Sequence, residues 1–239
     1  MRISIMQPYF FPYLGHFALV AAVDEWIVFD VTQYAPKTWM SRNRILHPKE
    51  GWQYVTVPLS NSSISLRTHE ARILSLADAK TSLLGKLSAF RRRAPFFAEV
   101  NDLVRDAFER AKSDSLCELN VHTLSVVCEY LGLPFSYRVC SNLNLTYPEE
   151  MGPGDWAPLI CHALAATEYV NPVGGRALFD PANFARIGVA LKFAEFGEFI
   201  YDPAPYQYQS RLSIIDVLLW NAPETVAEAL RSQVQLVAP

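Results

Sequence analysis

The chain has 239 residues, of which 51% are hydrophobic and 19% are charged, a composition typical of globular proteins and not of disordered ones. A chain of this length buries roughly 70% or more of its unfolded surface, so we expect one domain over residues 1–239. The formal net charge of −3 argues against a general DNA-binding protein, which needs a basic face.

The first predicted elements are a strand at Ile3–Ile5 and a helix at residues 14–23, whose apolar side chains recur at helical spacing. The loop between them contains two prolines and several aromatic rings. In an α/β fold this loop lies at the carboxyl edge of the sheet, where ligands usually bind. We therefore predict substrate contacts from Gln7, Tyr9 and Tyr13. The alternative is a rigid aromatic turn that leads into a core helix.

His16 is the histidine with the most suggestive position, because it follows Gly15 at the start of the first helix. A Gly-His pair at this place resembles the motif with which nucleotidyltransferases and class I aminoacyl-tRNA synthetases stabilise a leaving phosphate. Pro12 stands where that motif has its first histidine, and no convincing Lys-x-x-Ser partner follows. We predict a catalytic role for His16, and keep nucleotidyl or adenylyl transfer through the Gly15-His16 loop as an alternative function.

The second predicted strand, Trp26–Asp30, is a continuous apolar run of the kind found in parallel strands that are buried on both faces. Asp30 ends this strand and is the second catalytic candidate, as a general acid or base. Gln33 and Tyr34 follow and are predicted to bind substrate at the same edge. The alternative is that Asp30 only caps a turn.

A locally basic segment comes next, with Lys37, Trp39, Arg42-Asn43-Arg44 and His47 close together. The planar guanidinium group suits phosphates and carboxylates. We predict that Arg42, Asn43 and Arg44 bind the anionic part of a ligand, and that Trp39 stacks on it. A solvated basic loop is the alternative.

Two further strands are expected at Tyr54–Pro58 and Arg72–Leu76. Three helices are then predicted at about 79–92, 97–112 and 115–131, with no strand between them. We expect these helices to form a helical subdomain at residues 79–131 beside the sheet.

The rest of the chain resumes the alternation of strands and helices. Strands are predicted at Phe135–Val139 and Val189–Phe193, and helices at 155–167, at 181–187 and twice in the tail. This order indicates a three-layer, Rossmann-like α/β fold with a mainly parallel central sheet and a helical insertion.

Two places in this part are predicted to contribute to the substrate site. Gly174 and Gly175 allow a close approach of backbone and ligand, although any tight turn uses the same residues. Asp216 lies in an otherwise apolar helix, where a carboxylate needs a partner. The alternative is a capping pair with Ser213.

No cofactor motif is present in the sequence. Cys117, Cys128, Cys140 and Cys161 have no metal-ligand spacing, and we expect them to be reduced and structural. Walker, Gly-x-Gly-x-x-Gly, Gly-x-Ser-x-Gly and His-Glu-x-x-His motifs are absent, which disfavours P-loop, dinucleotide-dependent and common hydrolytic enzymes. The sequence therefore indicates no metal, and the cofactor stays unknown.

Six sequence blocks resemble the WbqC-like family in their order. They are MQPYFFPYLGHF, VDEWIVFDVTQY, RNRI, RRRAPFF, EYVNPVGG and LSIIDVLLWN, which together run from Met6 to Asn221. Proteins of this family are encoded among bacterial genes for O-antigen and related surface polysaccharides. The resemblance implies a role in that biosynthesis.

Together these features predict a transferase that acts on a nucleotide-linked amino sugar, with an acyl or aminoacyl carrier as the donor. A non-catalytic nucleotide- or sugar-binding protein is the alternative from another class. The amino-terminus lacks a secretion pattern and the chain has no apolar run long enough to span a membrane, so we expect a cytoplasmic protein without membrane insertion.

Overall fold

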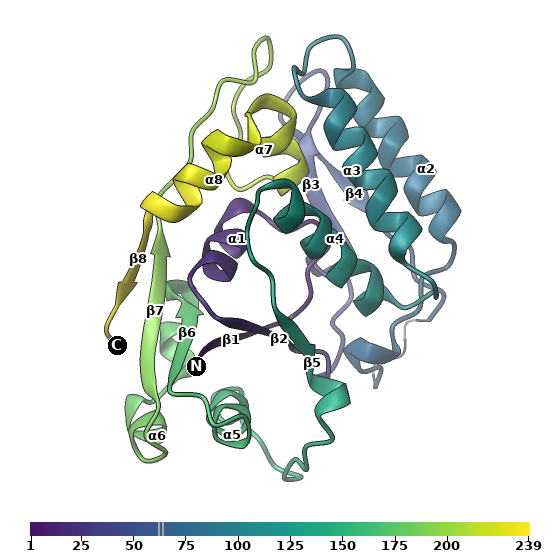
Figure 1. The fold of residues 1–239 in the computed structure, drawn as a ribbon. Coiled ribbons are helices and arrows are strands. Elements are labelled where there is room, and N and C mark those ends of the chain that lie inside the picture. Colours follow the sequence, from purple (N-terminus) through teal and green to yellow (C-terminus); the bar gives the residue numbers. More distant parts are fainter. Residues whose placement is uncertain (62, 64) are drawn as a thin grey trace.

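Six strands form the central sheet of the computed structural model, which describes residues 1–61, 63 and 65–239 (Figure 1). Their order across the sheet is β5-β2-β1-β6-β7-β8. The first five strands run parallel, and β8 pairs antiparallel with β7. The bounds are β1 Arg2–Met6, β2 Glu25–Val28, β5 Tyr137–Val139, β6 Glu168–Pro172, β7 Ala190–Phe196 and β8 Val234–Val237. The predicted mainly parallel sheet is confirmed.

Buried side chains alternate between the two faces of the sheet. On β2, Trp26 and Val28 pack into one apolar cluster and Ile27 into the other. Ile3 and Ile5 of β1 join the cluster that contains Ile27. Both faces are covered, which explains why β2 reads as an unbroken apolar run.

Helices cover the two faces and give the molecule three layers. Helices α1, α7 and α8 pack on one face, and α5 and α6 pack on the other (Figure 1). Their bounds are α1 Leu14–Ala21, α5 Trp156–Ala163, α6 Pro181–Ala185, α7 Ile214–Trp220 and α8 Pro223–Ser232. The predicted three-layer, Rossmann-like α/β class is therefore confirmed.

Three longer helices follow one another beside the sheet. They are α2 Leu76–Leu87, α3 Phe97–Arg110 and α4 Leu116–Tyr130. Ser75 and Ser115 begin α2 and α4 by accepting a hydrogen bond from the backbone of the third helical residue. Their apolar faces share one buried cluster with α1 and α7. Short 3-10 turns occur at η1 Thr68–Glu70, η2 Ser88–Phe90, η3 Cys140–Leu143 and η4 Val173–Leu178.

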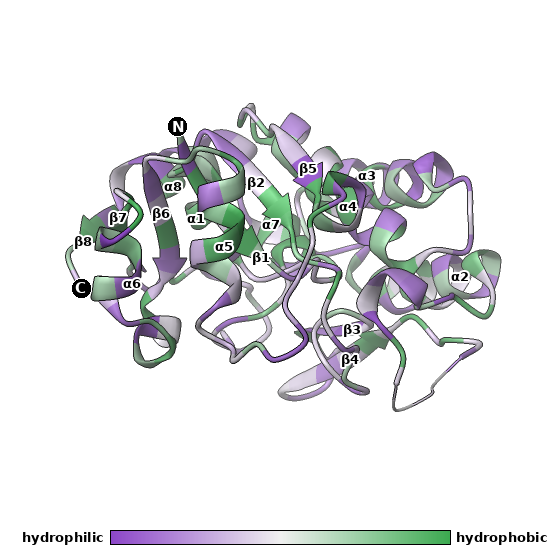
Figure 2. Cartoon of the chain, turned by 90° about the horizontal axis from the view of Figure 1, so that it is seen from below, coloured by the Kyte–Doolittle hydropathy of each residue, from purple (hydrophilic) through white to green (hydrophobic). Residues whose placement is uncertain are grey.

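A separate antiparallel hairpin, β3 Arg42–Leu46 and β4 Trp52–Thr56, lies apart from the central sheet (Figure 2). Its first strand contains the basic segment Arg42-Asn43-Arg44, for which the sequence analysis predicted no strand. The predicted strand at Arg72–Leu76 is wrong: Arg72 and Ile73 form only isolated bridges, and α2 begins at Leu76. None of the helices in the described part of the chain has the length and apolar character needed to cross a membrane.

Candidate functional site

The chain adds strands to the parallel sheet on opposite sides of the boundary between β1 and β6, which makes this boundary a topological switch point. From β1 the chain continues through α1 to β2 on one side, and from β6 it continues through α6 to β7 on the other side. Helices α1 and α6 lie on opposite faces of the sheet. Open α/β sheets bind their ligands in the crevice outside such a switch point, at the carboxyl ends of the strands. A ligand site is therefore expected at this edge of the sheet.

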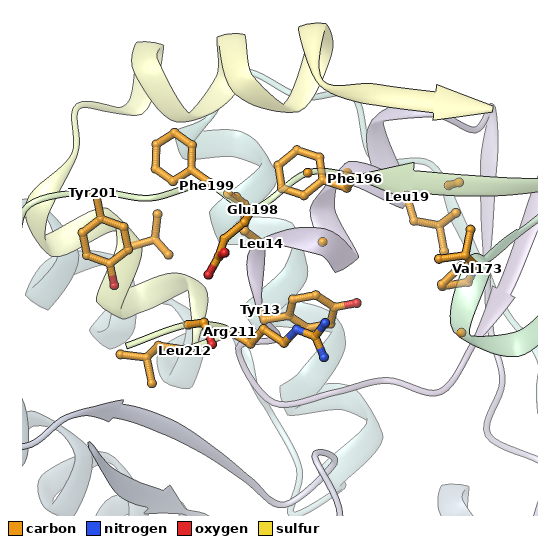
Figure 3. Close-up of a pocket in the computed structure, with 18 of the residues that line it drawn as sticks. Tyr13, Leu14, Leu19, Val173, Phe196, Glu198, Phe199, Tyr201, Arg211 and Leu212 are labelled. Carbon is orange, nitrogen blue, oxygen red and sulfur yellow. The ribbon is translucent and has the colours of Figure 1, made fainter. Parts of the chain in front are cut away.

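A cavity of about 590 Å³ opens there, and we call it the large chamber. Tyr13 and Leu14 line it from the start of α1, and Val173 and Gly174 line it from the turn after β6 (Figure 3). The end of β7 and the segment between β7 and α7 complete the wall with Phe196, Glu198, Phe199, Tyr201, Tyr208, Arg211 and Leu212.

A second cavity of about 240 Å³ adjoins the first, and we call it the small chamber. Its lining residues are Tyr9, Pro12, Tyr13, Trp39, Asn43, Arg44 and Arg211. Tyr13 and Arg211 line both chambers, so these two side chains form the junction between them. Burial raises the pKa of Tyr13 above its usual value of 10.0, and the positive charge of Arg211 partly opposes this shift.

The ring of Tyr13 lies on the first turn of α1. A Cβ atom at Gly15 would be 2.4 Å from Cε2 of Tyr13, so only glycine lets the ring occupy this place. His16 lies in the next position of the helix, with 2% of its surface exposed. Its ring centroid is 5.1 Å from that of Tyr9 and 5.0 Å from that of Trp26.

Burial lowers the pKa of His16 from 6.5 to about 3, although a hydrogen bond with the backbone of Gln7 partly opposes the shift. The imidazole is therefore neutral at physiological pH, and its Nε2 atom has no hydrogen-bond partner. His16 does not line either chamber.

Arg44 lies between two indole rings at the small chamber. Its guanidinium carbon is 5.3 Å from the ring centre of Trp39 and 5.0 Å from that of Trp52. Its Nη2 atom donates a hydrogen bond to the backbone oxygen of Arg211 at 3.3 Å. Arg211 has a φ of 56°, a left-handed conformation that is uncommon outside glycine. The two arginines are thus coupled through the backbone.

Arg42 points along the same face of β3 but lies outside both chambers. Its guanidinium group stacks over Tyr54 at 4.2 Å from the ring centre. Asn43 faces the other way and is buried. Its amide nitrogen donates to the backbone oxygens of Phe10 and Phe11, so its side chain fixes the loop that carries Tyr9 and Tyr13.

Glu198, Tyr208 and Arg211 are residues of the large chamber that the sequence analysis did not identify. The carboxylate of Glu198 points into the chamber (Figure 3) and accepts a hydrogen bond from the Tyr208 hydroxyl at 3.1 Å. The signal was present, because Glu198 lies just beyond a predicted strand. That strand was predicted to end at Phe193, whereas β7 ends at Phe196, next to the chamber.

Asp216 is completely buried behind the large chamber. Its carboxylate accepts hydrogen bonds from the Leu46 backbone nitrogen at 2.6 Å and from the Tyr201 hydroxyl at 2.8 Å. Burial raises the pKa of Asp216 to about 6, against the effect of these hydrogen bonds. Asp216 therefore links α7 to β3 and anchors Tyr201, and it does not itself line a chamber.

Residues 7–228 match the family model of the WbqC-like proteins. The chain belongs to this family. A protein of Mycobacterium tuberculosis (strain ATCC 25618 / H37Rv), described as "Uncharacterized protein Rv1507c", is 28% identical to it over 236 residues, which cover 96% of this chain and 97% of the relative. No solved structure matches the sequence.

In this WbqC-like protein the other catalytic candidate, Asp30, lies away from both chambers. It lines a separate cavity of about 340 Å³ with His69, Cys117 and Ser141 among its neighbours. Its carboxylate accepts hydrogen bonds from the backbone nitrogen and the hydroxyl of Ser141, at 2.9 and 2.7 Å. The structure thus brings Tyr9, Tyr13, Trp39, Asn43, Arg44 and Gly174 together, but not with Asp30.

The remaining predicted residues have other surroundings. Tyr34 is buried, and its hydroxyl donates to Ser41 at 2.8 Å. Gln33 pairs with Arg67 in an isolated bridge. Gly175 lies against Asn171, whose Nδ2 would be 2.2 Å from an added Cβ. Gly174 has open space around it and faces the large chamber.

All four cysteines of this WbqC-like protein are free and buried. Burial raises the pKa of Cys128 and Cys161 to about 12 and that of Cys140 to about 11. Burial and the nearby charge of Asp30 raise that of Cys117 as well. None is therefore a thiolate nucleophile at neutral pH. Among the described residues, no three His, Cys, Asp or Glu side chains are grouped so that they could hold a metal ion.

Proposed function

We propose that this WbqC-like protein is a transferase of surface-polysaccharide biosynthesis that acylates or aminoacylates a nucleotide-linked amino sugar held in the two chambers. The observation that carries the proposal is the junction at the switch point of the sheet. There Arg211 and Arg44 lie beside the exposed rings of Tyr13 and Trp39, between a small and a large cavity. The biosynthetic pathway itself rests on the family resemblance.

The proposed ligand has three parts that suit these surroundings. The pyrophosphate takes the junction, where guanidinium groups can donate several hydrogen bonds to phosphate oxygens. The base stacks in the small chamber on the rings of Tyr9 and Trp39. The sugar then lies in the large chamber, whose volume of about 590 Å³ also leaves room for the acyl group of the donor.

Direct transfer from donor to sugar fits the side chains better than a covalent enzyme intermediate. The cysteines are buried and protonated. The amine of the sugar is itself a nucleophile once it has lost a proton, and the enzyme has only to bring it to the carbonyl of an activated donor. The two chambers meet the need for a site that holds both molecules.

Ligand binding tests the proposal with two arginines that differ in position but not in chemistry. We predict that a panel of UDP-, TDP- and GDP-linked amino sugars contains one that binds, measured by calorimetry. Replacing Arg44, which lines the small chamber, in the variant R44A should weaken that binding by about 1.5–3 kcal/mol, the range for a hydrogen bond to a charged group.

R42A is the matched control, because Arg42 stacks on Tyr54 outside the chambers, and it should bind as the wild type does. Equal affinities for R44A and the wild type would contradict the placement of the phosphates. Binding without turnover by any acyl or aminoacyl thioester or ester would identify the non-catalytic binding protein instead.

A further inference from the structure

We infer that Glu198 is the acid–base catalyst of the transfer step, an inference that rests on the proposed function. Glu198 would accept the proton from the amine of the sugar while Arg211 holds the phosphate next to it.

Glu198 is the one carboxylate among the described residues that line the two chambers. Asp216 is completely buried behind Tyr201, and Asp30 lines a different cavity. His16 is 2% exposed and lies beneath the rings of Tyr9 and Tyr13 without lining a chamber. Any proton that leaves a ligand in the large chamber for an acidic side chain must therefore go to Glu198.

One hydrogen bond, from Tyr208, orients this exposed carboxylate, and ring contacts hold Tyr208 in place. The Tyr208 hydroxyl donates to Glu198 at 3.1 Å and lies 3.2 Å from the backbone oxygen of Phe199. The ring of Tyr208 packs edge-on against that of Tyr201 at 5.2 Å, and Tyr201 donates to Asp216. Burial raises the pKa of Tyr208 to about 12, so its phenol keeps the proton that it donates.

Glu198 and Arg211 line the same chamber, and Figure 3 shows the guanidinium group of Arg211 beside the ring of Tyr13, apart from the carboxylate of Glu198. These two oppositely charged side chains form no ion pair with each other, although they line the same cavity. A gap between opposite charges suits a ligand that carries an anion at one end and an ammonium group at the other. A sugar with a phosphate on one carbon and an amine on a nearby carbon is such a ligand.

The bound ammonium group first releases one proton to solvent. The amine nitrogen then attacks the carbonyl carbon of an acyl or aminoacyl thioester, an N–C bond forms, and the C–S bond breaks with its electron pair leaving on sulfur. The nitrogen loses one proton to the carboxylate of Glu198, which passes it to the departing thiolate. The products are an amide and a thiol, and the carboxylate is regenerated.

Two probes separate the role of Glu198 from the proposed function itself. UDP-glucosamine carries a free amine, and UDP-N-acetylglucosamine has the same frame without the charge. Below the pKa of that amine, the wild type should bind the first at least about tenfold more tightly, since a hydrogen bond to a charged group is worth about 1.5–3 kcal/mol.

In E198Q this preference should disappear, and kcat with a thioester donor should fall by about 10² to 10⁴. E195Q is the matched control. Glu195 is exposed on β7 opposite Gln235 and lies outside both chambers, so the variant should keep both the preference and the turnover.

Y208F tests the positioning role of Tyr208. Without its hydrogen bond the carboxylate is no longer held in place, so the preference for UDP-glucosamine and kcat should both fall part of the way to the values of E198Q. An active wild type with E198Q equal to it in preference and kcat would overturn the inference and leave the proposed function intact. A wild type that binds neither probe nor any other nucleotide sugar would overturn the proposed function.

Discussion

The position of the Tyr13 ring in the site depends on the absence of a Cβ atom at Gly15. Tyr13 is 38% exposed and is held in place by the helix backbone beneath it. An added Cβ at position 15 would meet the end of a movable side chain and not a fixed backbone. The ring would therefore swing away and the fold would survive.

We predict that G15A keeps or slightly raises stability, since alanine is favoured over glycine inside a helix by about 1 kcal/mol. The same variant should bind the nucleotide sugar at least about tenfold more weakly, because Tyr13 no longer forms the junction of the chambers. G85A is the control: nothing lies within 4 Å of an added Cβ at Gly85 of α2, so stability should rise without a change in affinity. Unchanged affinity in G15A would show that the ring is not needed where it lies.

At the scale of elements, the hairpin holds the loop that follows β1. Asn43 on β3 donates to the backbone oxygens of Phe10 and Phe11, and Ser213 donates to the second of these at 2.6 Å. Phe11 has a φ of 39°, so these hydrogen bonds secure a backbone conformation that phenylalanine rarely adopts. The segment before α7 and the hairpin thus hold Tyr9 and Tyr13 together.

We predict that N43A lowers the free energy of unfolding by about 2–3 kcal/mol, because it removes two buried hydrogen bonds and leaves the Phe10 carbonyl without that donor. Urea denaturation measures this change. S213A, which removes one donor, should lose about half as much, and N142A on the exposed end of η3 should change stability by no more than about 0.5 kcal/mol. Equal stabilities of N43A and N142A would contradict the structural role of Asn43.

The order of strands decides which predicted site residues meet. The sequence predicted correctly that the loop after β1 and Asp30 after β2 lie at the ends of neighbouring parallel strands. It could not show that β6 lies on the other side of β1, because no local pattern records the order of strands. The switch point therefore lies between β1 and β6, and Asp30 lies on the far side of β1 from it.

The sequence did not predict β3 and β6, because polar residues or proline interrupt the apolar pattern that is typical of a strand. In β3 the arginines face the rim of the site while Asn43 and Ile45 are buried. Exposed and buried residues therefore alternate as in other strands, but the arginines and the asparagine give the segment the composition of a basic loop. In β6 the Asn171-Pro172 pair reads as a turn, although both residues pair with β7. Arg211 and Glu198 lie in irregular segments, whose place depends on tertiary packing alone.

At the scale of the whole molecule, two buried groups affect the pH dependence of stability in opposite directions. Burial lowers the pKa of His16 from 6.5 to about 3 and raises that of Asp216 from 3.8 to about 6. Below pH 6.5 the unfolded chain gains a proton at position 16 that the folded chain refuses, so stability falls with falling pH. At Asp216 the folded chain binds the proton first, so its contribution is complete below pH 3.8 and is lost as pH rises through about 6.

Each group changes the free energy of unfolding by about 1.4 kcal/mol per pH unit between about pH 4 and 6, and in the wild type these two opposite changes nearly cancel. We predict that the free energy of unfolding of D216N follows the titration of His16 alone. It should rise by roughly 2 kcal/mol relative to the wild type as the pH is raised from about 4.5 to 6. In H16F the phenyl ring can take the same place among Tyr9, Tyr13 and Trp26. The free energy of unfolding of this variant should fall by a similar amount relative to the wild type over the same rise in pH. Urea denaturation at three pH values measures both differences. Profiles of the two variants that run parallel to that of the wild type would mean that neither group titrates as its burial requires.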